Sequence, residues 1–190
     1  RTIDAKSTWT AGHSERVTKL ALKIGSAMGL TPKELDVLHR GGLLHDIGKI
    51  GTPASILDKR ESLSAEEREL IQKHPIMGAR ILEPISAYGD AIPIVLQHHE
   101  RYDGRGYPYG IPGDEISLKA RILAVIDTFD AMLTDRPYRR SLTLFRAKEE
   151  LRHGAGSQFD PYVVNAFLDM LESREEELLM TSGYNLSLPE

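Results

Sequence analysis

The sequence predicts an all-α protein, and three observations support this fold class. Apolar residues recur at steps of three and four along most of the chain, which is the period of an amphipathic helix. Two capping boxes, at Thr31–Glu34 and Ser64–Glu67, begin helical segments. No stretch alternates apolar and polar residues for more than a few positions, as a half-buried strand would.

The predicted helices begin near the N-terminus and follow one another closely. The apolar face of the first helix consists of Val17, Leu20, Ala21, Ile24 and Met28. The second helix starts at Pro32, in the first helical position after the cap Thr31, and runs toward His45. The third starts at the capping box Ser64–Glu67 and runs toward His74.

The second half of the chain continues the same pattern. Pro75 ends one helix and starts another, which extends to Leu82. A helix over residues 92–100 carries the pair His98-His99 at its end. The last three helices are expected at 118–133, 142–152 and 161–180. Residues 103–113 contain four Gly and two Pro, which predicts a turn-rich loop directly after the histidine pair.

Composition limits the class of protein. Hydrophobic residues make up 41% and charged residues 27% of the 190 residues, as in ordinary soluble domains. The net charge of -4 argues against a general nucleic-acid binder. No apolar run is long enough to cross a bilayer, and no signal-peptide pattern is present. The absence of cysteine excludes disulfides and thiolate metal sites, and we expect a cytoplasmic location. Because the chain opens with Arg1 and not with Met, we expect it to be a piece of a longer protein.

The histidines and two aspartates suggest a metal centre. Imidazole and carboxylate groups suit a divalent metal such as Fe, Mn, Ni or Zn. The candidates are five histidines and two carboxylates: His13, His45, Asp46, His74, His98, His99 and Asp127. These are too many for one ion but suit two ions that share Asp46, an arrangement that favours phosphodiester hydrolysis. The residues alone leave open a metallohydrolase or unrelated packing and surface histidines, and we assign His39 and His153 to the latter.

Several cationic side chains lie near these candidates in the sequence. Lys49 follows His45 by one helical turn, so it either reaches a substrate phosphate or is a surface lysine. Residues 135–140 contain Arg136, Arg139 and Arg140, a basic cluster in an acidic chain. Arginine suits bidentate phosphate contacts and stacking on a nucleobase, although a solvated helix end has the same composition.

These motifs resemble the HD-GYP cyclic di-GMP phosphodiesterases, a subgroup of the HD superfamily of metal-dependent phosphohydrolases. The resemblance extends from about residue 3 to residue 140, with the motifs in the family's order and spacing. The matching stretches are Gly12–Val17, His45–Gly51, His74, His98–Glu100, Asp103–Pro108, Ala124–Asp127 and Asp135–Arg139.

The resemblance implies a role for each candidate. One metal is expected on His13, His45, Asp46 and Asp127, and a second on His74, His98 and His99, with Asp46 bridging both. Asp46 and Lys49 are the expected catalytic residues, and Lys49 contacts the scissile phosphate. Tyr107, Arg136 and Arg139 are expected to bind the dinucleotide, and Asp130 to support a metal-bound histidine.

The resemblance also implies the reaction. Some members carry a glutamate one turn before the first histidine and bind a third metal, whereas Trp9 occupies that position here, which predicts two metals. Iron is the leading candidate, with manganese, nickel or zinc as alternatives. A metal-bridging hydroxide is expected to attack a phosphorus of cyclic di-GMP and to give linear pGpG, GMP or both, as part of bacterial signalling.

Two other functions remain as alternatives, and the resemblance carries expectations about organisation. The alternatives are a cyclic di-GMP receptor module with negligible turnover, and an HD hydrolase of another substrate such as cyclic GMP-AMP. We expect residues 1–182 to form one HD-GYP catalytic domain, an HD-type helical bundle with a Gly/Pro-rich loop, and residues 183–190 to form a loose tail. The full-length chain is expected to carry an N-terminal sensory or receiver domain and to form a homodimer as one candidate assembly. No DNA, RNA or membrane contact is expected of this domain.

Overall fold

The computed structural model describes residues 12–59, 61–135 and 140–184, and it confirms the all-α fold class. Within these residues there is no β-strand; an isolated bridge joins Ala155 and Phe159. No helix in this part of the chain has both the length and the apolar character needed to span a membrane. Trp9, Arg136 and Arg139 lie outside the described residues.

The helices follow the predicted order, with short 3-10 turns between them. The long helices are α1 (His13–Ala27), α2 (Pro32–Leu44), α7 (Leu118–Leu133), α8 (Leu144–Gly154) and α9 (Pro161–Ser182). Shorter helices are α3 (Ala54–Leu57), α4 (Ala65–Gln72), α5 (His74–Leu82) and α6 (Ile92–Gln97). The 3-10 helices are η1 (Ile47–Gly51), η2 (Ser86–Ala91) and η3 (Gly113–Glu115).

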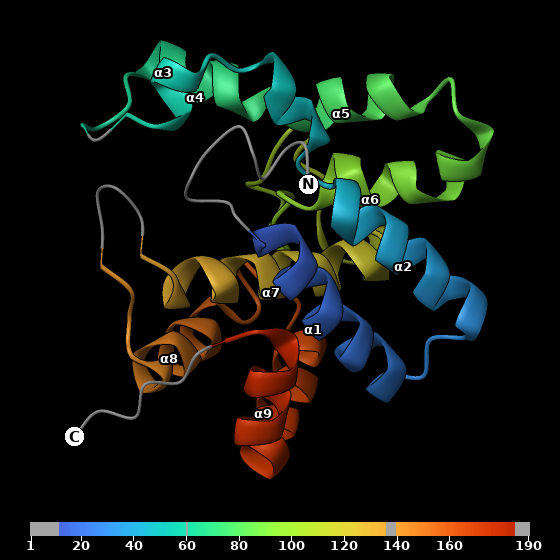
Figure 1. Cartoon of the computed structure of the whole chain (residues 1–190), viewed down its shortest axis with the longest axis vertical. Coiled ribbons are helices and arrows are strands. Elements are labelled where there is room, and N and C mark those ends of the chain that lie inside the picture. The colour runs from blue at the N-terminus through green and yellow to red at the C-terminus, as the bar shows by residue number, and fades with distance from the viewer. Residues whose placement is uncertain (1–11, 60, 136–139, 185–190) are drawn as a thin grey trace.

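The core forms around α1 and α7, which lie at the centre of the molecule (Figure 1). Helix α1 packs against α2, α7 and α9, and α7 also packs against α6 and α8. Ile126 and Phe129 on α7 are fully buried, as are Leu20 and Ile24 on α1. Removing such side chains from water is the main driving force of folding, so this packing fixes the relative positions of the two helices.

Both predicted capping boxes are present. The Thr31 hydroxyl accepts a hydrogen bond from the Glu34 backbone N–H at 3.3 Å, and the Glu34 carboxylate accepts one from the Thr31 backbone N–H at 3.0 Å. Ser64 and Glu67 make the same pair of bonds at 3.2 and 2.8 Å. These reciprocal bonds satisfy N–H groups that have no partner inside the helix, and they define where α2 and α4 begin.

The predicted helix over 92–100 is too long at its C-terminal end. Helix α6 ends at Gln97, and the Val95 carbonyl, which would accept the backbone N–H of residue 99 in a continuing helix, instead contacts His98 Nδ1 at 2.8 Å. The His99 carbonyl accepts the backbone N–H of Tyr107 at 3.2 Å, which ties it to the loop. The pair His98-His99 therefore lies at a helix end, where its side chains can turn inward.

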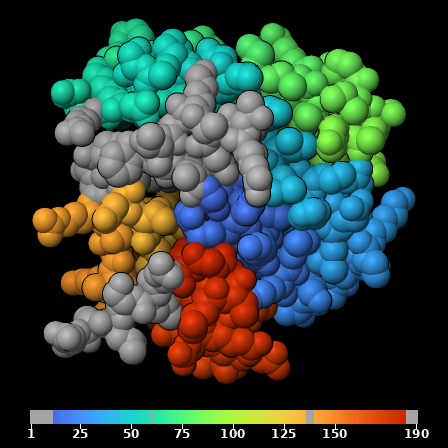
Figure 2. All heavy atoms as spheres, in the orientation of Figure 1, coloured from blue at the N-terminus to red at the C-terminus, as the bar shows by residue number. Residues whose placement is uncertain are grey.

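Boundaries of α8 and α9 also differ from the prediction. Helix α8 begins two residues late, at Leu144, because the Thr143 side chain caps it by accepting the Arg146 backbone N–H. Helix α9 extends to Ser182 and is followed by Gly183 at a φ of 96°, which only glycine adopts without strain. Tyr184, assigned to a loose tail from the sequence, is 8% exposed and packs on the core. Figure 2 shows the C-terminal part of α9 beside α1 on the surface.

Candidate metal centre

The fold brings all seven predicted donor residues together. Each lies at or near the end of a helix, except Asp127, which lies within α7. They form two adjacent groups in which the donor atoms lie within 4.8 Å of one another: Asp46, His74, His98 and His99 in the first, and His13, His45 and Asp127 in the second. The first is called the Asp46 group below and the second the His13 group. The rings of His45 and His98, one from each group, have centroids 5.0 Å apart.

Three of the histidines are oriented by the same backbone contact. The Nδ1 atoms of His45, His74 and His98 lie 2.7, 2.8 and 2.8 Å from the carbonyl oxygen three residues earlier, that of Gly42, Ile71 and Val95. A carbonyl oxygen only accepts, so each Nδ1 must carry the proton, and in the neutral ring Nε2 presents a lone pair. Metal-ligating histidines are held in this way, with one nitrogen donating to the protein and the other facing the metal.

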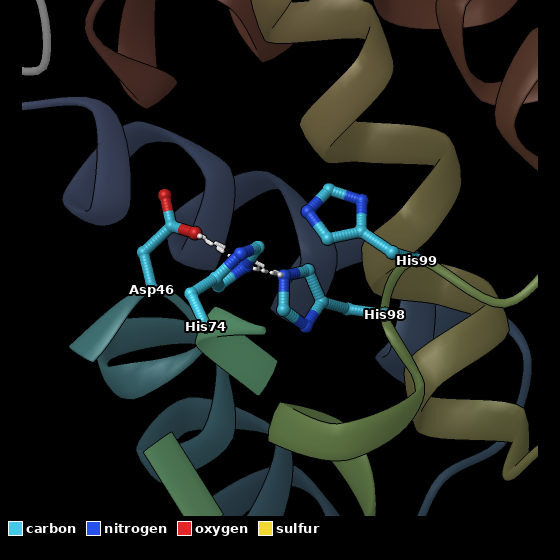
Figure 3. Close-up of side chains that lie close together, drawn as sticks. All are labelled: Asp46, His74, His98 and His99. Carbon is cyan, nitrogen blue, oxygen red and sulfur yellow. Dashed lines mark hydrogen bonds and ion pairs between the residues drawn. The ribbon is translucent and has the colours of Figure 1, made fainter. Parts of the chain in front are cut away.

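The Nε2 atoms oriented in this way face one another. His74 Nε2 and His98 Nε2 lie 3.3 Å apart (Figure 3). Two lone pairs at this distance repel unless a proton or a cation lies between them. Burial lowers the pKa of His98 well below its usual value, and the neighbouring imidazoles of His99, His45 and His74 lower it further. The neutral ring is therefore favoured. The pair is therefore suited to a metal cation.

Asp46 lies between the two groups. Its Oδ2 is 3.5 Å from His45 Nε2 of the His13 group, and its Oδ1 is 3.3 Å from His74 Nε2 of its own group. Burial raises the pKa of this carboxyl, but Lys49 and the imidazoles of His45 and His74 outweigh burial, so the pKa lies well below its usual range and Asp46 is ionised. Asp46 Oδ1 and His45 Nε2 are buried without a hydrogen-bond partner among the described residues. Unsatisfied donor atoms aimed into one space fit a bound cation.

His13 is held by two carboxylates of α7. Its Nε2 is 3.1 Å from Asp127 Oδ1, and its Nδ1 is 2.7 Å from Asp130 Oδ2. Burial disfavours the charged ring, but the hydrogen bonds to Asp127 and Asp130 and their charges outweigh this effect and raise the pKa of His13 to about 10. The structure thus places Asp130 where the sequence predicted a supporting carboxylate.

Lys49 reaches the centre from η1. Its Nζ donates to Asp46 Oδ2 at 2.6 Å, and its side chain is partly exposed. The two residues are three positions apart, so one turn brings their side chains together. The turn itself lies close to α5, because buried Gly48 lies against the backbone of His74 and Gly78. A cation next to the carboxylate between the two groups is well placed to meet an anionic substrate.

The Gly/Pro-rich loop is packed on the Asp46 group. The ring of Tyr107 stacks on His99, with centroids 4.8 Å apart and planes at 25°. Burial lowers the pKa of His99 to about 3, so this ring is neutral and able to ligate. Glu100, which is 4% exposed, accepts the backbone N–H groups of Tyr109 and Gly110 at 2.7 and 3.0 Å. These two bonds hold the loop over the histidine pair.

A cavity of about 270 Å³ borders this stack. It is lined by His98, His99, Tyr107, Arg101, Arg105, Thr128, Phe159 and neighbouring residues. Arg101 forms a bidentate ion pair with Asp103 at 3.0 and 2.8 Å, which ties the Asp103 carboxylate to the loop.

Three residues with a contact to the centre or its loop had no predicted role: Glu100, Arg16 and Tyr184. Glu100 and Arg16 lie inside motifs that the sequence singled out, and the spacing of Arg16, one turn after His13, was a usable signal. The contact of Tyr184 with Asp130 spans 54 residues, and no local pattern indicates it.

A model of the HD domain family matches residues 1–163 of the chain. The 3'3'-cGAMP-specific phosphodiesterase 3 of Vibrio cholerae is 39% identical over 84% of this chain and 35% of its own length. The cyclic di-GMP phosphodiesterase response regulator RpfG of Xanthomonas campestris is 38% identical over 88% of this chain and 45% of its own length. The chain therefore spans less than half the length of these relatives.

A solved structure gives a similar match. Bd1817, an HDG"Y"P protein from Bdellovibrio bacteriovorus, has a TM-score of 0.69 and 25% identity. The match covers 88% of this chain and 53% of that protein.

Proposed function

Because the chain belongs to the HD domain family, we propose that it is a metal-dependent phosphodiesterase that hydrolyses cyclic di-GMP to linear pGpG, GMP or both. One observation carries the proposal. The two oxygens of buried Asp46 face histidines of two adjacent donor groups, at 3.5 and 3.3 Å. A carboxylate in this position can serve two cations at once, and paired cations are characteristic of phosphoester hydrolysis.

The donor set determines which cations are candidates. Five imidazoles and two carboxylates, in a chain without cysteine, suit a first-row divalent metal. We propose two ions per chain, iron first, with manganese, nickel or zinc as alternatives. The Asp46 group would hold one ion and the His13 group the other, with Asp46 shared. When bound, the two ions would supply a water of lowered pKa and positive charge for the phosphate.

The chain's own residues then have distinct tasks. The ammonium of Lys49, beside Asp46, would bind a phosphate oxygen. There it would stabilise the negative charge that develops on the phosphate in the transition state. Tyr107, stacked on His99, would position a base or ribose of the dinucleotide next to the centre. We propose Arg136 and Arg139 as further dinucleotide contacts from the sequence alone, since they lie outside the described residues.

A second candidate substrate is 3'3'-cyclic GMP-AMP. The observation that favours it is the 39% identity to a V. cholerae phosphodiesterase named for that dinucleotide. The phosphodiester chemistry is the same for both substrates, so the two proposals differ only in the base contacts. For the full-length protein we further propose an N-terminal sensory or receiver domain and a cytoplasmic location; the homodimer remains a prediction.

The decisive experiment measures metal content and turnover on the same sample. Purified protein is loaded anaerobically with Fe(II) or Mn(II), analysed for metal per chain, and assayed with cyclic di-GMP and with 3'3'-cyclic GMP-AMP. We expect about two metals per chain and linear product from at least one substrate. Bound metal and bound dinucleotide without hydrolysis would favour the receptor alternative, and absence of metal under every loading condition would refute the proposal.

A matched pair of variants lies on one helix. His45→Ala removes a donor at the C-terminal end of α2, whereas His39→Ala changes an exposed histidine of the same helix. We expect His45→Ala to lose metal and turnover together and His39→Ala to retain both. Equal metal content and activity in the two variants would contradict the assignment of the centre.

A further inference from the structure

His13 is oriented differently from His45, His74 and His98. His45, His74 and His98 each bond through Nδ1 to a carbonyl in the last turn of a helix just before them. His13 is the first residue of α1, and the preceding Gly12, at a φ of 71°, turns the chain into that helix. Among the described residues, which begin at Gly12, no helical turn precedes His13 to provide a carbonyl. Its orientation depends instead on a side chain from another helix, Asp130 of α7.

Asp130 in turn is held by two side chains from different parts of the chain. Its Oδ1 accepts the Tyr184 hydroxyl at 2.8 Å and Arg16 Nε at 2.8 Å, and its Oδ2 accepts Arg16 Nη2 at 3.1 Å beside the bond to His13. The Asp130 side chain is fully buried. Buried carboxylates are stable as ions only when donors surround them, so these bonds fix both the charge and the rotamer of Asp130.

The position of Tyr184 is itself well defined. Its backbone N–H donates to the Leu179 carbonyl at 3.0 Å across the turn at Gly183, which closes the C-terminal end of α9. Its ring packs edge-on against Phe129, with centroids 6.2 Å apart, and the Arg16 guanidinium lies 5.8 Å from the ring centre. Figure 2 shows this end of α9 against α1.

We propose that Tyr184 and Arg16 are positioning residues for the His13 group, so that the C-terminal end of α9 controls how well that group binds a divalent cation. The contacts run from the Tyr184 hydroxyl through Asp130 to His13, whose Nε2 faces Asp127. In the Asp46 group, His74 and His98 have their own backbone contacts and do not use Asp130. Loss of the Tyr184 hydroxyl therefore weakens one group and spares the other. This inference rests on the proposed metal centre but not on its substrate.

The test is a metal titration of metal-free protein with Mn²⁺, with free metal and bound metal measured at equilibrium. Tyr184→Phe keeps the ring packing and removes only the hydroxyl, and Tyr162→Phe, on the exposed face of α9, is the matched control. Loss of an outer contact of this kind lowers metal affinity about 10-fold to 100-fold. We expect a loss in this range for one of two binding equivalents in Tyr184→Phe, and none in Tyr162→Phe.

Arg16→Lys provides a second variant, since lysine keeps the charge but not the paired N–H groups. We expect it to weaken the same equivalent. If both binding equivalents keep their affinity in Tyr184→Phe and in Arg16→Lys, the inference is overturned. It is also overturned if both equivalents weaken equally and Tm falls, because the contact would then be structural only. Since binding is measured without substrate, a wild-type protein that binds metal but hydrolyses nothing would refute the proposed function and leave this inference testable by the same titration.

Discussion

Gly48 is the position where a single added methyl group should affect both folding and the metal centre. A Cβ on Gly48 would lie 1.9 Å from the His74 carbonyl oxygen and 2.6 Å from the Gly78 nitrogen. Both are backbone atoms, which cannot rotate away. Non-bonded carbon and oxygen atoms need about 3 Å or more, so η1 and α5 would have to separate by about 1 Å. Gly48→Ala therefore moves His74 relative to Asp46 and Lys49.

The size of the effect follows from this displacement. Overpacking of a closed contact costs about 1–3 kcal/mol, and we expect the upper end because backbone lies on both sides. For a chain of this length, a destabilisation of about 3 kcal/mol lowers Tm by about 6–12 °C. A misplacement of about 1 Å at a catalytic centre reduces turnover about 100-fold. We expect both losses, together with a lower metal content in the Asp46 group.

Gly51→Ala is the control, because a Cβ there meets only the Met77 side chain at 3.7 Å, an ordinary contact in the same 3-10 helix. Thermal unfolding and metal analysis of the two variants make the comparison. If Gly48→Ala unfolds within about 1 °C of Gly51→Ala and keeps its metal, the reasoning from the close backbone contact is refuted.

Three further predictions concern the centre and its loop. Asp46→Asn should remove the shared charge and lower metal content by at least one ion per chain, as measured by elemental analysis; full content would contradict a bridging role. The pKa of His13 is raised to about 10, and binding requires the neutral ring, so the metal affinity of its group should rise about tenfold per pH unit from pH 7 to 9, with about one proton released per metal. A metal affinity that does not change with pH, without proton release, would argue against binding of the metal to His13. Glu100→Gln weakens the bonds to Tyr109 and Gly110 by removing charge, and should raise KM more than it lowers kcat in a steady-state assay; an unchanged KM would speak against loop anchoring.

Protonation of His13 also makes the folding stability of the metal-free protein depend on pH. The pKa of His13 in the folded, metal-free protein lies above its usual value of 6.5. Protonated His13 therefore contributes stability that is complete below about pH 6.5 and is lost as the pH rises toward about 10. Bound metal replaces the proton, so the metal-loaded protein should lose less stability over this range.

The sequence predicts the metal-donor residues better than the contacts that orient their side chains. Helical periodicity and capping boxes locate the helices, because these signals are local and repeat along the chain. The seven donors are assigned because their motifs resemble those of the HD-GYP family, whereas the residues alone leave packing and surface histidines as an alternative. The early end of α6 was missed because the His98 side chain takes the Val95 carbonyl, a contact that competes with the next helical bond. Tyr184 was missed because a hydroxyl bond across the fold has no periodic signature.

The carbonyls that orient His45, His74 and His98 belong to the last turns of α2, α4 and α6. Such carbonyls have no partner within their helix, so each imidazole also acts as a C-terminal cap. These histidines thus retain a structural use even without metal. Replacing one of them would therefore remove a helix-end contact as well as a metal donor, so a loss of stability in such a variant has a cause that is independent of metal.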